Sequence, residues 1–105
     1  MININDIRAL CNDETIKATQ HFTNRIIKRG IDYDDILYII MNGEIIEGYP
    51  DDYPFPSVLI YGCTADNKPL HTVVGMGGGD IYLITSYWPS LSKWENDYRT
   101  RKVVK

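Results

Sequence analysis

The hydrophobic pattern of this chain changes once, at Asn42-Gly43, from helical spacing to strand alternation. Before that point, apolar residues recur three and four positions apart. After it, short β-branched and aromatic runs are separated by glycine, proline and aspartate. Helices that precede a series of consecutive strands are typical of the α+β class. The pattern therefore predicts N-terminal helices packed on a four-stranded antiparallel meander.

Three helices are expected before the change. The first places apolar residues at positions 4, 7, 10 and 11 after the capping candidates Asn3 and Asn5. The second follows positions 12–13 and ends at Gly30, a residue type that commonly terminates helices. The third begins at Asp32, where acidic residues suit the positive end of a helix dipole, and stops at Asn42-Gly43.

The second part of the chain predicts strands over 44–49, 58–63, 70–76 and 81–87. Gly77, Gly78 and Gly79 predict a turn between two strands, because phosphate-binding glycine loops lead into a helix instead. Ser92-Lys93-Trp94-Glu95 matches a capping box and predicts a short C-terminal helix.

Length and charge restrict the class of protein. With 105 residues the chain forms one domain, 1–105, and no apolar run approaches a membrane span. The net charge of −3 argues against broad non-specific DNA binding, although Lys and Arg gather at 17–29 and 93–105. The start of the chain has no signal-peptide pattern, so we expect a cytoplasmic protein.

Cys11 and Cys63 are too few for a disulfide framework and are expected as two buried thiols. Together with the chain's two histidines they offer the ligand types of a zinc site. The close paired spacings of structural zinc modules are missing, and no metal or other cofactor is expected.

Both histidines lie in segments with a sharp local pattern, and imidazole is the side chain best suited to proton transfer near neutral pH. His21, Arg25, Lys28 and Arg29 fall on one helical stripe, at i, i+4, i+7 and i+8. One interpretation is a cationic rim with His21 pointing inward, and the other is an ordinary solvated basic face.

His71 belongs to the strand before the glycine turn, and Thr85 and Tyr87 belong to the strand after it. Pairing Gly75 with Ile81 places His71 opposite Thr85. Pairing Met76 with Ile81 places Thr85 and Tyr87 on the other face of the sheet. We expect the first register. A histidine packed against a hydroxyl for structural reasons is the alternative.

Several short motifs, taken together and in order, resemble the bacterial domain-of-unknown-function 4258 family over about residues 18–102, with 1–17 as an N-terminal helical extension. They are His21-x-x-x-Arg25, Arg29-Gly30-Ile31, Asn42-Gly43-Glu44-Ile45-Ile46-Glu47-x-Tyr49-Pro50-Asp51-Asp52, Pro54-x-Pro56, Gly62-x-Thr64, Pro69-Leu70-His71-x-Val73-Val74, Thr85-x-Tyr87-x-Pro89 and Trp94-Glu95. The resemblance implies the α+β fold of the barnase, EndoU, colicin and RelE group. It also implies a similarity to RelE- and BrnT-like toxins of toxin–antitoxin pairs.

That resemblance also implies metal-independent cleavage of single-stranded RNA through attack by the ribose 2′-hydroxyl. The implied catalytic residues are His21, His71, Arg25, Thr85 and Tyr87, with the two histidines as acid and base in an order left open and Arg25 holding phosphate oxygens. The basic stripe adds Lys28 and Arg29 as candidates for binding RNA phosphates. The resemblance implies two partners, RNA and a zinc-finger antitoxin of the MqsA kind. A homodimer is a further expectation, and no membrane contact is expected. The alternative is an inactive binding module of the same fold. The enzyme requires both imidazoles, Arg25 and Tyr87 in one cleft.

Overall fold

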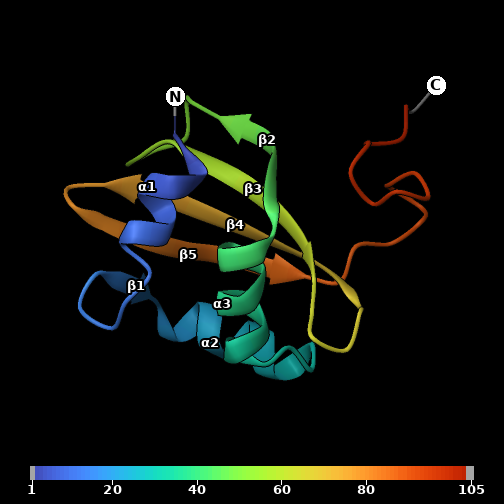
Figure 1. Ribbon diagram of the computed structural model, residues 1–105, viewed down its shortest axis with the longest axis horizontal. Coiled ribbons are helices and arrows are strands. Elements are labelled where there is room, and N and C mark those ends of the chain that lie inside the picture. The colour runs from blue at the N-terminus through green and yellow to red at the C-terminus, as the bar shows by residue number, and fades with distance from the viewer. Residues whose placement is uncertain (1, 104–105) are drawn as a thin grey trace.

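The computed structural model describes residues 2–103. Within this range the chain forms three helices and five strands (Figure 1). They are α1 (Ile4–Ala9), β1 (Ile16–Ala18), α2 (Gln20–Lys28), α3 (Tyr33–Asn42), β2 (Glu44–Tyr49), β3 (Ser57–Cys63), β4 (Pro69–Gly77) and β5 (Asp80–Tyr87). The α+β class is confirmed, and the last four strands form the expected meander.

The sheet is mixed and has one more strand than expected. Its order is β1-β5-β4-β3-β2, with β1 parallel to β5 and the other pairs antiparallel. The expectation of a continuous helix from about residue 13 to Lys28 was therefore wrong. Ile16–Ala18 pairs with Ile81–Leu83 instead, and α2 begins only after Thr19. Thr19 Oγ1 accepts a hydrogen bond from the Phe22 amide at 3.1 Å, which is a regular N-cap.

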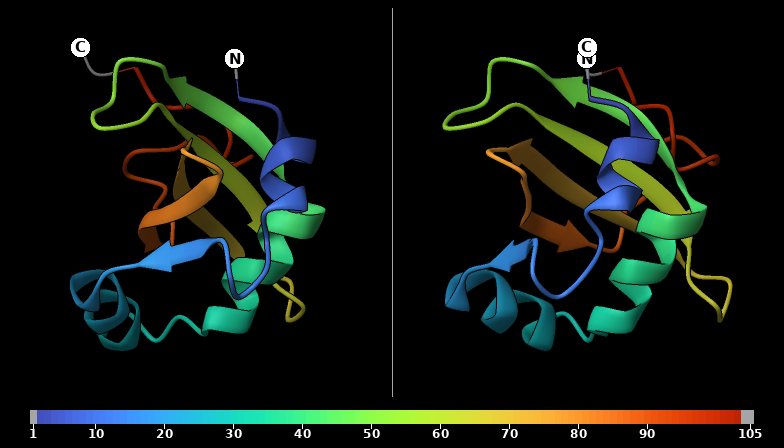
Figure 2. Two further views of the ribbon diagram at one scale, coloured as in Figure 1. Left: turned by 90° about the vertical axis from the view of Figure 1, so that its left-hand side faces the viewer. Right: turned by 60° about the vertical axis from the view of Figure 1, so that its left-hand side comes forward.

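All three helices contribute to one hydrophobic core on one face of the sheet. Figure 2 shows α1 and α3 along this face. The helices contribute the buried side chains Ile7, Phe22, Ile26, Ile36, Ile39 and Ile40, which pack with Val58, Ile60, Leu70, Val74, Ile81 and Leu83 of the strands. Arg8 of α1 donates hydrogen bonds to the carbonyl oxygens of Ile40 (3.0 Å) and Gly43 (2.8 Å). The first helix thus caps the C-terminal end of α3.

The register of β4 and β5 differs from the expected one. Met76, not Gly75, pairs with Ile81, which alone would place Thr85 and Tyr87 on the core face. A β-bulge corrects this, because Ile84 is an extra residue between the pairs Val74–Leu83 and Val73–Thr85. Beyond the bulge His71 lies opposite Tyr87. His71, Thr85 and Tyr87 therefore share a face, as expected, but in a different register.

The C-terminal segment, residues 88–103, leaves the end of β5 (Figure 1) and contacts the second face of the sheet at His71. The helix expected from Ser92 was wrong: residues 91–93 form a turn, and Trp94 makes an isolated antiparallel bridge with Arg101. Trp94 is 2% exposed, and its ring packs edge-on against His71 with 4.6 Å between centroids. Burial of this indole outweighs the local helix signal of the capping box.

The two cysteines differ in exposure from what was expected. Cys11 is half-buried and Cys63 is exposed, so the prediction of two buried thiols was wrong. Between residues 2 and 103, no helix has both the length and the apolar character that a membrane crossing needs. The same range contains no group of three or more His, Cys, Asp or Glu side chains placed to hold a metal ion.

Candidate functional site

Helix α2 presents its polar side next to the edge of β5. Phe22 and Ile26 face the core, and this leaves His21 and Arg25, one turn apart, exposed on the other side. His21 does not point inward as expected. The two side chains border a cavity of about 190 Å³ between α2 and β5, lined by His21, Phe22, Arg25, Arg29, Ile84 and Thr85. His21 and Arg25, which the i, i+4 spacing places on one stripe, thus border the same cavity.

Arg29 ties the end of α2 to the edge of β5. Its Nη1 atom donates a hydrogen bond to the carbonyl oxygen of Ser86 at 2.7 Å and contacts Thr85 Oγ1 at 3.4 Å. This edge is free because the pairing with β1 ends at Leu83. The guanidinium therefore donates to a carbonyl oxygen at the open edge of β5. It also lines the cavity, where its remaining N–H groups can bind an anion.

A second cavity, of about 490 Å³, adjoins the first. Both are lined by Arg29 and Thr85, and the second adds Tyr87, Trp88, Ser90, Lys93, Trp94 and Arg101. We call the two together the α2–β5 groove. Its lining combines an imidazole, three guanidinium groups, an ammonium group and the hydroxyls of Thr85 and Tyr87. Such a set can bind phosphate oxygens by charge and by hydrogen bonds.

Lys28, predicted to bind RNA, lies on the outer side of α2. It lines a shallow depression of about 290 Å³ together with His21, Asn24 and Arg25. Since His21 and Arg25 border this depression and the groove alike, Lys28 extends the positive charge of the groove toward solvent.

His71 lies beneath the groove and is not part of its wall. Its side chain is 0% exposed, with Nε2 2.7 Å from the carbonyl oxygen of Tyr98 and Nδ1 3.2 Å from the hydroxyl of Tyr87. A carbonyl only accepts, so Nε2 carries the proton and Nδ1 accepts from Tyr87. The expected common cleft for both imidazoles is therefore not formed. His21, Arg25, Thr85 and Tyr87 border one groove, and His71 supports it from behind.

Burial sets the protonation of the inner residues. It lowers the pKa of His71, against the opposing effects of the Tyr98 carbonyl and of Glu47, which favours the neutral ring. Burial also raises the pKa of Tyr87, so its phenol stays protonated. The hydroxyl of Tyr87 is thus a proton donor held in place by a neutral imidazole.

Two residues of the groove were not predicted from the sequence. Lys93 and Arg101 come from the C-terminal segment, where the only signal was the cluster of basic residues. Arg101 lies 4.6 Å from the centroid of the Trp94 ring and binds Glu47 through Nε (3.2 Å) and Nη2 (2.9 Å). These hydrogen bonds lower the pKa of Glu47 and fasten the segment over the sheet.

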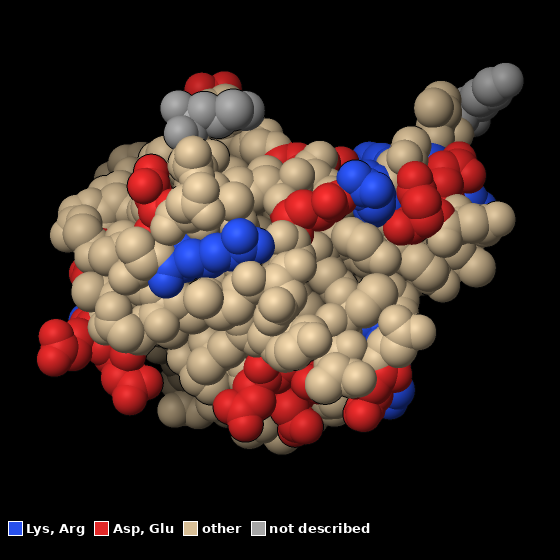
Figure 3. Space-filling model, viewed as in Figure 1, with Lys and Arg blue, Asp and Glu red and all other residues tan. Residues whose placement is uncertain are grey.

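Figure 3 shows the distribution of charge on one face of the molecule, in the direction of view of Figure 1. Acidic and basic side chains are interspersed there, with acidic groups more frequent along the lower edge, and no extended basic surface is visible on that face. That face therefore offers no general attraction for a polyanion.

Comparison with known protein families identifies the family of the chain. The profile of the family described as domain of unknown function (DUF4258) matches residues 18–88, and the chain belongs to this family. No curated protein matches the sequence. The match includes His21, His71 and Tyr87 and ends at Trp88, earlier than the expected residue 102. Helix α1 and most of the C-terminal segment thus lie outside it.

Proposed function

We propose that this chain is a metal-independent endoribonuclease of the toxin type that binds single-stranded RNA in the α2–β5 groove. The observation that carries the proposal is that Arg29 and Thr85 belong to both cavities. They join His21 and Arg25 at one end to Tyr87 and Arg101 at the other. Cleavage of RNA without a metal needs a base, an acid and cations around one phosphate, and these residue types line two adjoining cavities.

In this proposal His21 accepts the proton of the ribose 2′-hydroxyl as its oxygen attacks phosphorus. The bond from phosphorus to the 5′-oxygen breaks. For this step the O–H of Tyr87 turns from His71 Nδ1 to the leaving oxygen, supplies its proton and becomes a phenolate that solvent reprotonates. The products are a 2′,3′-cyclic phosphate and a free 5′-hydroxyl. Arg25 and Arg29 hold the non-bridging oxygens, and Thr85 donates a hydrogen bond to the charge that develops there. This mechanism differs from the two-imidazole one expected from the sequence, because His71 is buried and cannot reach the RNA. Tyr87 replaces the second imidazole, and His71 acts as a positioning residue for Tyr87.

The fold supports the proposal only by analogy. The helices and the four-stranded antiparallel meander β2–β5 agree with the RelE- and barnase-like group that the sequence resembles, although β1 makes the whole sheet mixed, and a fold does not determine a function. A zinc-finger antitoxin that inhibited the protein would have to cover the groove, which its acidic residues could do by binding Arg25 and Lys93.

The burial of His71 favours a second candidate, a binding module that retains the groove and does not cleave. Its two ring nitrogens are both engaged by Tyr87 and Tyr98, so His21 is the imidazole open to the groove. The module shares the phosphate contacts of the enzyme and lacks its proton transfers. Binding and cleavage must therefore be measured separately.

The test uses the full chain and a labelled single-stranded RNA in buffer containing EDTA. The enzyme gives fragments that end in a 2′,3′-cyclic phosphate, and a 2′-O-methylated strand is not cut. His21→Ala should lower the cleavage rate by about 10²–10⁴-fold. Arg25→Ala should weaken binding and reduce the slope of log affinity against log salt by about 0.7. Lys68→Ala, an exposed lysine between β3 and β4, is the control.

The outcomes separate the candidates. Salt-dependent binding that needs Arg25 but produces no fragments identifies the module and overturns the enzyme. Absence of binding, or binding that Arg25→Ala and Lys68→Ala weaken equally, overturns both.

A further inference from the structure

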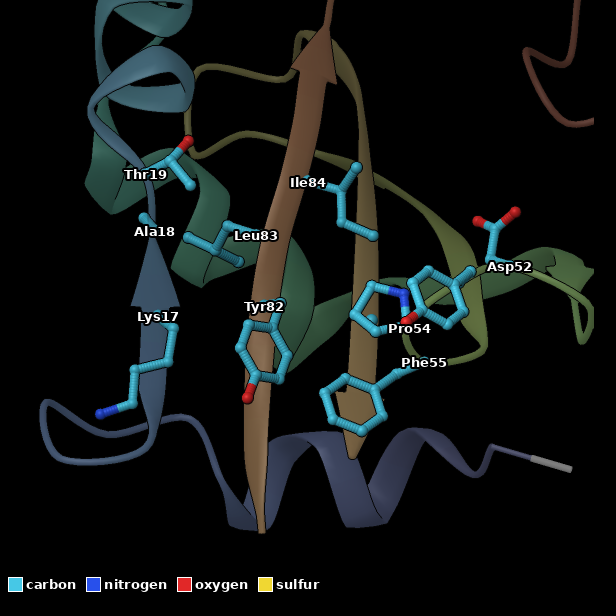
Figure 4. A pocket seen from close by; sticks show the side chains of 11 residues that line it. Lys17, Ala18, Thr19, Asp52, Pro54, Phe55, Tyr82, Leu83 and Ile84 are labelled. Carbon is cyan, nitrogen blue, oxygen red and sulfur yellow. The ribbon is translucent and has the colours of Figure 1, made fainter. Parts of the chain in front are cut away.

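A cavity of about 570 Å³ lies beside the α2–β5 groove, on the same side of the sheet. Figure 4 shows it between Lys17 and Thr19 at the end of β1 and Pro54 and Phe55 of the loop before β3, with β5 below. Ile84 lines both this cavity and the groove. As the bulged residue of β5, Ile84 is the boundary between them.

Two glycines of β4 create the cavity. A Cβ on Gly77 would lie 2.1 Å from the Phe55 ring, so this glycine provides the space in which Phe55 sits. Gly75 lines the cavity, and a Cβ there would lie 3.3 Å from Ile84 Cδ1 and 3.8 Å from Tyr82 Cβ. A larger side chain at position 75 would fill the floor. Gly75 thus leaves the floor of the cavity open, and Gly77, on the same face of β4, makes room for Phe55, which forms part of the wall.

Aromatic rings line this space. Phe55 stacks on Tyr82 with 5.3 Å between centroids and an angle of 23° between the ring planes. Tyr53, which is 94% exposed, also borders the cavity. The polar groups at the rim are the ammonium of Lys17 and the carboxylate of Asp52, which accepts a hydrogen bond from Ser57. The volume and this mixed lining are within the usual range for a small planar ligand.

We infer that this cavity binds one unpaired base of the RNA strand whose phosphates lie in the α2–β5 groove; the inference rests on the proposed function and adds a base site to it. Tyr82 and Thr85 are about 10 Å apart along β5 at ~3.3 Å per residue. A base held against Tyr82 and Phe55 is then next to the phosphate held by Arg25 and Arg29. Stacking on aromatic side chains is the general means by which proteins hold unpaired bases.

The test compares two strands that cannot be cleaved: a short 2′-O-methylated RNA and the same sugar–phosphate strand without bases. Wild-type protein should bind the strand with bases about 5- to 100-fold more tightly. Gly75→Val, which fills the floor, and Tyr82→Leu, which removes the ring, should each bring this ratio toward one. Neither should change the affinity for the strand without bases, because the phosphate contacts are unaltered.

Tyr33→Leu, in a tyrosine of α3 that is 39% exposed, is the matched control and should leave both affinities unchanged. Circular dichroism checks folding, and Tyr82→Leu keeps the test valid if Gly75→Val does not fold. Equal wild-type affinities for the two strands overturn the inference. So does an unaltered ratio in both cavity variants, which is the result if an apolar peptide uses the cavity. If neither strand binds wild-type protein in a salt-dependent way, the proposed function itself fails and the base site with it.

Discussion

The Nε2 atom of His71 lies 2.7 Å from the backbone carbonyl oxygen of Tyr98, and this hydrogen bond joins the centre of the sheet to the C-terminal segment. The same ring accepts from the hydroxyl of Tyr87 at 3.2 Å and packs against Trp94. His71 therefore links three elements: β4, β5 and residues 88–103. A protonated ring would lose the hydrogen bond from Tyr87, because Nδ1 would become a donor.

This arrangement predicts that the protein is less stable in mild acid. Burial lowers the pKa of His71 in the folded protein below its ordinary value of 6.5. Between that lowered pKa and about 6.5, the unfolded chain binds a proton that the folded chain does not. The free energy of unfolding should therefore be highest above pH 6.5 and should fall as the pH decreases through this window. Urea denaturation at a series of pH values measures the slope.

His71→Gln should reduce this slope, whereas His21→Gln, which removes the exposed imidazole, should retain it. An NMR titration of the His71 ring gives the same information without a substitution: its C–H signals should stay at their neutral positions at pH 6.5. A ring that is already half protonated at that pH would contradict the buried geometry.

A second prediction concerns Trp94, which covers His71 and is 2% exposed. Trp94→Ala should lower the free energy of unfolding by about 3–5 kcal/mol, the usual cost of removing a large buried aromatic ring. It should also make His71 reactive toward diethyl pyrocarbonate, which mass spectrometry of the modified peptide would detect. Leu91→Ala, in an exposed residue of the same segment, should change neither quantity. Unchanged protection of His71 in Trp94→Ala would show that the segment is not what covers it.

The sequence predicted elements whose signals are local. Helix α3 starts after Asp32 and ends before Gly43, as its flanking residues indicate. Strand β1 was missed because three residues, Ile16–Ala18, continue the spacing of the following helix, and their pairing depends on Ile81, far away in the sequence. Tertiary contacts of this kind override local propensity.

The candidate site was likewise predicted only where it depends on residues close together in the sequence. The spacing of His21 and Arg25 placed them on one stripe of a helix but left open whether that stripe is a site or a solvated face; in the structure both border one cavity. The burial of His71 depends on Trp94 and Tyr98, which lie in a segment wrongly predicted to be helical. The bulge at Ile84 could not be foreseen either, because either register satisfies the alternation of β4 taken alone.

A third prediction separates the two functions of Arg29. Arg29→Lys keeps the positive charge but removes the planar group that reaches the Ser86 carbonyl and Thr85. The free energy of unfolding should fall by about 1–2 kcal/mol, because a carbonyl at the strand edge loses its donor. If charge alone were needed, RNA affinity in the groove would be retained. We expect it to fall as well, since the guanidinium also holds Thr85.

Arg25→Lys is the matched control for that comparison. Arg25 is exposed and carries the same charge on the same helix. Its replacement should leave the free energy of unfolding within about 0.5 kcal/mol of wild type, as for most surface substitutions. Equal destabilisation by the two variants would show that the hydrogen bond to Ser86 has no net effect on stability.

The last prediction concerns glycines with opposite requirements. At Gly62 of β3 a Cβ would lie 2.8 Å from Cβ of Ile39, so Gly62→Ala should push α3 away from the sheet and lower the free energy of unfolding by about 1–3 kcal/mol.

At Gly30, where φ is +66° and the space is open, the cost of a side chain comes from the backbone conformation instead. Gly30→Ala should cost about 1–2 kcal/mol. Gly30→Asn should cost less, because asparagine tolerates the left-handed region, whereas Gly62→Asn should be worse than Gly62→Ala. Thermal denaturation of the four variants measures this reversal, and the same order at both positions would contradict the packing of α3 on β3.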